Sequence, residues 1–90
     1  MDFEWDPAKA LQNFRKHGVR FETAVLAFED PHAVLLRDDA SEMEERWILL
    51  GMIPSGRVLV VVHTVRDEET VGIVSARRAD SQERMFYGGH

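Results

Sequence analysis

The stretch that decides the fold is residues 46–64, RWILLGMIPSGRVLVVVHT. Two apolar runs, 46–53 and 57–64, flank a Pro-Ser-Gly turn, and this pattern predicts two antiparallel strands joined by a short loop. The second run is apolar at successive positions, so we expect both faces of its strand to be covered. We therefore place residues 57–64 at the centre of a sheet.

Shorter patterns on either side complete a prediction for the whole chain. Asp6-Pro7 and Gly18 are typical of a helix start and a helix stop, and Asp80 with Glu83 forms a capping signature for a closing helix. The apolar stripe of the first helix is expected to contain Ala10, Leu11 and Phe14. Further strands are expected at 3–5, 32–36 and 70–77, and a second helix at 22–28. The predicted class is α+β: a small antiparallel sheet flanked by helices, in the order β-α-α-β-β-β-β-α, forming a single domain over residues 1–90.

Composition narrows the possible functions. The chain has 90 residues and a net charge of −5. It contains no cysteine, and this absence excludes disulfides and thiolate metal sites. No signal-peptide pattern and no membrane-length apolar run is visible, so we expect a cytoplasmic protein without membrane contact. Residues 1–45 hold five Lys/Arg against eleven Asp/Glu, whereas residues 46–90 hold six against five. A local basic patch is possible, although overall attraction to a nucleic acid would be weak.

The most reactive groups gather near the C-terminus. Arg77 and Arg78 end the last strand, and Glu83, Arg84 and Tyr87 follow on the closing helix. Arginine suits phosphate binding because its planar guanidinium is always charged and donates in pairs. The alternative is a solvated helix end held by salt bridges, and the residues alone leave both interpretations open.

Motifs along nearly the whole chain resemble the BrnT family. They are Trp5-Asp6-Pro7, Lys9, Asn13, Lys16-His17-Gly18-Val19, Phe21-Glu22, Ala24, Asp30-Pro31, Glu44-Glu45-Arg46, Val62-His63-Thr64, Arg66, Ile73, Ser75-Ala76-Arg77-Arg78-Ala79, Glu83-Arg84 and Tyr87. The resemblance implies the toxin of a bacterial type II toxin–antitoxin pair with a RelE/ParE-like fold. It implies RNA cleavage that arrests translation, and a DNA-binding, BrnA-like antitoxin with which the toxin represses its own operon. The alternative is a non-catalytic module of the same fold that only binds its partner.

Metal-independent RNA cleavage needs a base, an acid and a group that stabilises the charged phosphorane. Arg66 and Arg77 are the candidates for the last role, and antiparallel pairing should bring Arg46 near His63 and Arg66. Arg66 lies at the turn of its hairpin and Arg77 at the far end, which favours two clusters over one pocket. The predicted catalytic residues are Arg46, His63, Arg66 and Arg77.

A second set of side chains is predicted to bind RNA, and each has a structural alternative. His63 could also be a core histidine, and Lys16 with His17 could simply complement the dipole of a helix C-terminus. The capping signature already engages Glu83, which weakens it as a base. The four histidines lack ligand spacing, so neither metal nor cofactor is expected. The predicted RNA-binding residues are Lys16, His17, Arg78, Arg84 and Tyr87.

Overall fold

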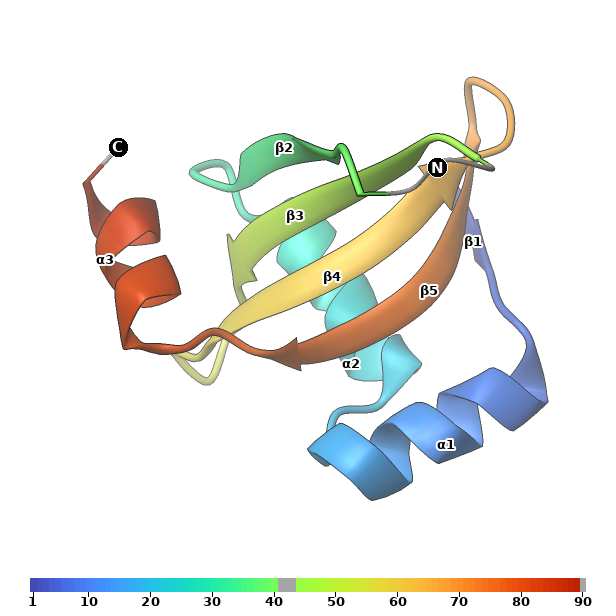
Figure 1. The fold of residues 1–90 in the computed structure, drawn as a ribbon, viewed down its shortest axis with the longest axis horizontal. Helices are drawn as coiled ribbons and strands as arrows, with labels where there is room; N and C mark the ends of the chain where they lie inside the picture. Colours follow the sequence, from blue (N-terminus) through green and yellow to red (C-terminus); the bar gives the residue numbers. More distant parts are fainter. Residues whose placement is uncertain (41–43, 90) are drawn as a thin grey trace.

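A computed structural model describes residues 1–40 and 44–89 (Figure 1). Its strands form one sheet in the order β1-β5-β4-β3-β2. The strands are β1 (Asp2–Glu4), β2 (Val34–Asp38), β3 (Arg46–Met52), β4 (Val58–Val65) and β5 (Thr70–Arg78). The helices are α1 (Pro7–His17), α2 (Phe21–Ala24) and α3 (Ser81–Gly88), with a 3-10 turn η1 (Val25–Glu29) after α2.

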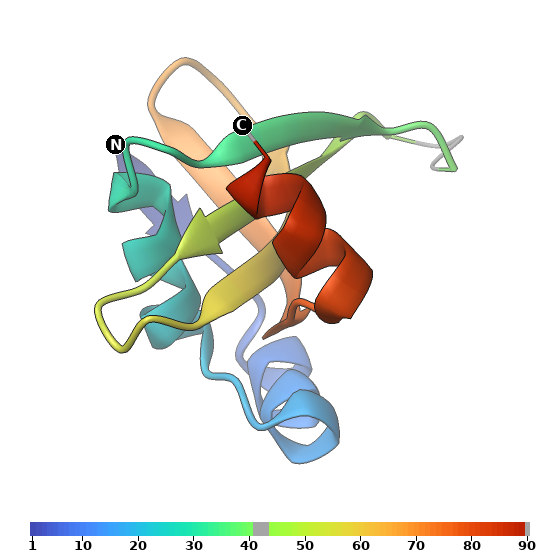
Figure 2. The ribbon, with the colours of Figure 1, turned by 90° about the vertical axis from the view of Figure 1, so that its left-hand side faces the viewer.

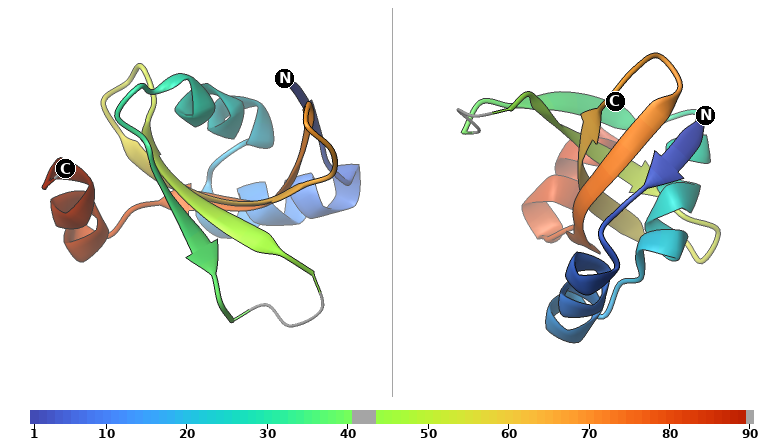
Figure 3. Two further views of the ribbon diagram at one scale, coloured as in Figure 1. Left: turned by 90° about the horizontal axis from the view of Figure 1, so that it is seen from above. Right: turned by 90° about the vertical axis from the view of Figure 1, so that its right-hand side faces the viewer.

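The α+β class is confirmed, and β4 lies at the centre of the sheet as predicted. The prediction of an all-antiparallel sheet is wrong, because β1 pairs with β5 in parallel. This pairing extends only over Thr70 to Gly72, so most of the outer edge of β5 has no strand beside it. The parallel direction lets the chain leave β1 and turn back under β5 as α1, which Figure 3 shows from the side.

Helix α1 has the ends that the sequence predicts but a different buried side. Asp6 accepts a hydrogen bond from the Ala8 amide at 2.8 Å, and Gly18 ends the helix in the left-handed region at a φ of 70°. The buried residue is Asn13, whereas Leu11 is 50% exposed. Phe14 is also exposed, at 36%, so of the predicted apolar stripe only Ala10 packs against the core.

The helix expected over 22–28 is short and changes form. It consists of α2 and then η1, which packs closely on β3. A Cβ atom on Gly51 would lie 2.5 Å from the Ala27 carbonyl oxygen, so glycine permits this approach.

The two faces of the sheet are covered unequally. Phe21, Leu59 and Val61 are fully buried on the side of α1 and α2. On the other side, α3 covers Val58 and Val60 near one end of the sheet and has no buried residue of its own (Figure 2). The predicted cover on both faces of β4 is therefore confirmed only in part. In the described part of the chain, no helix has the length and apolarity to cross a membrane.

Candidate functional site

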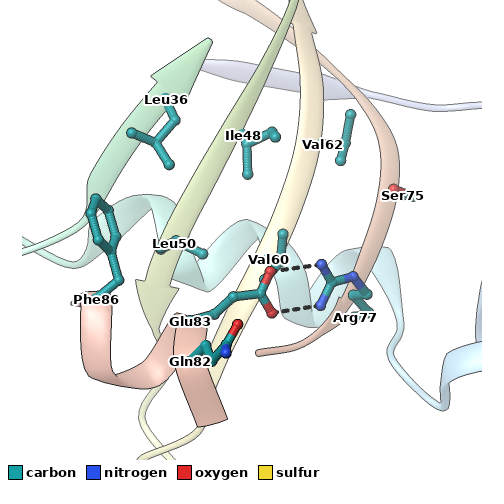
Figure 4. A pocket seen from close by; sticks show the side chains of 10 residues that line it. All are labelled: Leu36, Ile48, Leu50, Val60, Val62, Ser75, Arg77, Gln82, Glu83 and Phe86. Carbon is teal, nitrogen blue, oxygen red and sulfur yellow. Dashed lines mark hydrogen bonds and ion pairs between the residues drawn. The ribbon is translucent and has the colours of Figure 1, made fainter. Parts of the chain in front are cut away.

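A groove lies on the partly covered face of the sheet, between the strands and α3 (Figure 4). Alternate residues of neighbouring strands share a face, so β2, β3 and β4 supply an apolar floor. Strand β5 and helix α3 supply the polar groups, and α3 adds the apolar Phe86. The volume of the groove is about 360 Å³. It is lined by Leu36, Ile48, Leu50, Val60, Val62, Ser75, Arg77, Gln82, Glu83 and Phe86.

The polar centre of this groove is a two-bonded ion pair between Arg77 and Glu83. Arg77 Nη1 lies 2.8 Å from Glu83 Oε1, and Nη2 lies 2.8 Å from Oε2. Two parallel hydrogen bonds fix the plane of the guanidinium as well as its position. Glu83 is itself held in place, because it also accepts from the Asp80 amide while the Asp80 side chain accepts from the Glu83 amide.

The ion pair determines what each of its groups can do. The hydrogen bonds from Arg77 lower the pKa of the Glu83 carboxyl to about 2, so this group is ionised at neutral pH and accepts a proton poorly. The same hydrogen bonds raise the pKa of Arg77. A guanidinium has five N–H donors, and the described contacts use three of them. Arg77 is 42% exposed, so its other donors can meet an anion in the groove.

Tyr87 and Arg84 attach α3 to the rest of the chain. The Tyr87 hydroxyl donates to the carboxylate of Asp30, which also accepts from the Met52 amide at 2.7 Å. Burial acts to raise the pKa of Asp30, but hydrogen bonds from Tyr87 and from backbone amides outweigh it and the pKa is lowered. The hydrogen bond to Asp30 raises the pKa of Tyr87. Arg84 donates to the Ala79 carbonyl oxygen at 2.9 Å.

The pairing of Trp47 with His63 brings the start of β3 beside His63, as predicted, but the His63 side chain is buried away from the two arginines. His63 is buried, its ring packs edge-on against Phe28 at 4.9 Å between centroids, and its Nδ1 lies 3.2 Å from the Val61 carbonyl oxygen. Burial lowers the pKa of this imidazole. The ring therefore lies on the face of the sheet that the helices α1 and α2 cover, where it has the role of a core side chain.

Arg66 and Arg46 each form an ion pair with a different acidic neighbour. Arg66 Nε lies 3.6 Å from Glu4 Oε1, and Arg46 Nε lies 3.1 Å from Glu44 Oε1. Glu44 and Arg66 line one polar cleft of about 350 Å³, together with Lys9. Arg66 therefore lies in a different hollow from Arg77, as the hairpin geometry predicts, and Arg46 is not among the residues that line either hollow.

The other predicted residues separate into two places. Lys16 and His17 line a third hollow, between α1 and β5, together with Ser75. Arg78 is exposed and pairs with Leu59, so it faces away from the groove that contains Arg77, in agreement with the predicted alternation. Sequence reasoning missed Ser75 as a lining residue, although its position two residues before Arg77 on one strand is a usable signal.

No metal centre is visible among the residues that the structure describes. Within residues 1–40 and 44–89, no three His, Asp or Glu side chains lie close enough to hold an ion. Metal independence itself stays a prediction.

Comparisons with known proteins agree on one family. The sequence model of the family described as "Ribonuclease toxin, BrnT, of type II toxin-antitoxin system" matches residues 5–83. The crystal structure of the Brucella abortus ribonuclease toxin BrnT is similar, with a TM-score of 0.72 and 26% identity over 90% of this chain and 99% of that one. No curated protein matches the chain. Since the family model covers most of its length, the chain belongs to the BrnT family of ribonuclease toxins of type II toxin–antitoxin systems.

Proposed function

We propose that this protein is an endoribonuclease that cuts RNA without a metal ion, with Arg77 binding the phosphate at the cut. The observation that supports this role is the guanidinium held by two 2.8 Å bonds at the edge of an open groove. A donor that is already oriented stabilises developing charge without the cost of reorganisation.

The reaction follows from RNA itself. The 2′-hydroxyl gives its proton to a base and its oxygen bonds to the neighbouring phosphorus, while the bond from phosphorus to the 5′-oxygen of the next nucleotide breaks and that oxygen takes a proton from an acid. The products are a 2′,3′-cyclic phosphate and a 5′-hydroxyl. Arg77 donates to the phosphate oxygens, whose negative charge grows in the phosphorane. Glu83 orients Arg77 and Tyr87 anchors α3, because hydrogen bonds already occupy the carboxylate and the hydroxyl.

The same groove suits neutralisation by a partner. Its apolar lining is incompletely covered, with Leu36 38% exposed and Phe86 46% exposed, and it borders the positive Arg77. An acidic, BrnA-like antitoxin segment that packs on this lining would cover Arg77 and block RNA. We infer that the cognate antitoxin also carries DNA binding, that the complex represses its own operon, and that the fold is related to RelE and ParE toxins. The expected compartment is the cytoplasm.

Expression and cleavage assays test the proposal. Expression of the toxin alone should arrest bacterial growth, and co-expression of the neighbouring antitoxin gene should restore growth. The purified toxin should cut RNA in excess EDTA and leave cyclic phosphate ends. Antitoxin binding without growth arrest would favour the non-catalytic module, and loss of cleavage in EDTA with recovery in magnesium would refute the metal-free mechanism.

A further inference from the structure

Three neighbouring hollows follow β5 and share lining residues. The polar cleft that contains Arg66 and the hollow that contains Lys16 share Lys9 and Val74. That hollow and the Arg77 groove share Ser75. The series therefore connects the two arginine clusters that hairpin geometry separates.

The middle hollow, which we call the α1 groove, is lined by Lys9, Gln12, Asn13, Lys16, His17, Val74 and Ser75. Lys9, Gln12 and Lys16 are three and four residues apart, so they share one face of α1. The opposite wall is the edge of β5 beyond Gly72, where β1 no longer pairs. Asn13 fixes this geometry by donating to the Val19 and Ala76 carbonyl oxygens, at 3.0 and 2.8 Å, and accepting from the Ala76 amide at 3.1 Å.

The α1 groove is positive although the chain as a whole carries a net charge of −5. Its lining includes two lysines and no acidic residue. Among the described contacts, neither Lys9 nor Lys16 forms an ion pair, in contrast to Arg37, Arg46, Arg66 and Arg77, which all do. Ammonium groups that form no described ion pair, beside the outer edge of a strand, are suited to the phosphates of a single nucleic-acid strand.

We propose that the RNA strand enters along this edge, with its phosphates held by Lys9 and Lys16, and bends over Ser75 to bring the next phosphate to Arg77. The inference rests on the proposed function and gives RNA a path to the site. From Gly72 to Arg77 the strand edge is about 17 Å long, at roughly 3.3 Å per residue, which is enough for several phosphates. Lys9 and Lys16 are positioning residues in this proposal, since they do not contact the reacting phosphate.

A pair of charge-matched double variants tests the path. Lys9→Ala with Lys16→Ala removes the two lysines of the α1 groove. Arg15→Ala with Arg57→Ala removes equal charge at residues that do not line this groove, one of them on the same helix. Circular dichroism shows whether both variants fold, and Lys→Gln versions keep the side-chain length if either does not.

The binding probe is a 2′-O-methyl oligonucleotide, which cannot be cut because it lacks the attacking hydroxyl. Affinity should fall about tenfold in the lysine variant, and the slope of log affinity against log salt should shrink by about 1.4, or roughly 0.7 for each phosphate contact. The cleavage rate at saturating unmodified RNA should stay unchanged, and the arginine control should match wild type. Equal losses in the two variants would overturn the path. If the wild-type protein binds the probe through the lysines but never cuts RNA, the proposed ribonuclease function is refuted and the binding path is not.

Discussion

Arg77 and Arg66 occupy similar places, each at or just beyond the end of a neighbouring strand, yet their surroundings differ. Arg77 makes two 2.8 Å bonds to Glu83, whose side chain is 26% exposed. Arg66 makes one 3.6 Å contact with Glu4, and these two side chains are 63% and 50% exposed. Only the first geometry fixes a guanidinium, and a fixed donor is what charge stabilisation requires.

The difference comes from what holds each carboxylate. Glu83 is the third residue of α3, where the reciprocal bonds with Asp80 fix its side chain. Glu4 ends a strand of three residues at the sheet edge, next to solvent. The carboxylate at the start of α3 therefore orients Arg77, whereas the carboxylate on the short edge strand β1 holds Arg66 only by one long contact.

The largest effect is expected at Arg77. Arg77→Ala should lower the RNA cleavage rate about 100-fold, the loss typical of removing one oriented donor. Arg77→Lys should be nearly as damaging, because an ammonium keeps the charge but loses the paired bonds. Growth arrest and single-turnover cleavage measure both variants, with antitoxin binding as the folding control. Near-normal activity of the lysine variant would show that diffuse charge is sufficient.

The Glu83→Gln variant should show the next largest effect, a decrease in the free energy of unfolding. Losing a charge-assisted pair costs about 1–2 kcal/mol at neutral pH once screening around the half-exposed Arg77 is allowed for. The folded-state pKa of Glu83 is depressed, so its contribution is present above pH 4.5 and is lost as pH falls toward about 2. Urea unfolding at several pH values measures this loss. Glu68→Gln, in the exposed β4–β5 loop, is the control, and a gap between the Glu83 variant and wild type that does not narrow in acid would contradict the assignment.

Tyr87→Phe tests the anchor of α3 apart from its ion pair. The variant removes one hydrogen bond to Asp30, for a loss of about 1 kcal/mol, or roughly 4–8 °C in melting temperature for a domain of this size. Because the pKa of Tyr87 is raised above its ordinary 10.0, this contribution should persist below pH 10 and vanish as pH rises further. Thermal melts measure the change, with the 77%-exposed Met85 replaced by Ala as the control. Equal melting temperatures for Tyr87→Phe and Met85→Ala would show that the Tyr87 hydroxyl does not anchor α3.

Local signals in the sequence predicted most of the elements. The β3–β4 hairpin, the caps at Asp6 and Gly18 and the capping box of α3 each depend on residues a few positions apart. The parallel pairing of β1 with β5 could not be predicted from local signals, because the two strands are more than sixty residues apart in the chain. Asn13 was missed for the same reason, since two of its hydrogen bonds go to Ala76 and a polar helix residue is normally assigned to solvent.

Within the candidate site, the sequence predicted residue types better than their grouping. The capping signature already implied that Glu83 was engaged, and strand alternation correctly placed Arg77 and Arg78 on opposite faces. The face of the sheet on which His63 lies could not be predicted. The register between β4 and β5 shifts between Val62 and His63, and no local sequence signal indicates this shift. The α1 groove also depends on packing between distant elements.

Arg66→Ala should have the smallest effect, and it tests the comparison most directly. The sequence alone gives Arg66 the same role as Arg77, but its loose contact with Glu4 predicts only a weaker hold on RNA, a loss of about threefold in affinity with an unchanged maximal rate. Gly72→Ala provides a second approach, because its new Cβ would lie 3.4 Å from Arg66 Nε and 2.8 Å from Thr64 Oγ1 and would displace both side chains. Both variants should cut RNA at the wild-type rate once substrate is saturating. A loss of maximal rate in Arg66→Ala as large as in Arg77→Ala would mean that the reacting phosphate lies between the two arginines, and that the fixed geometry at Arg77 is not what selects the site.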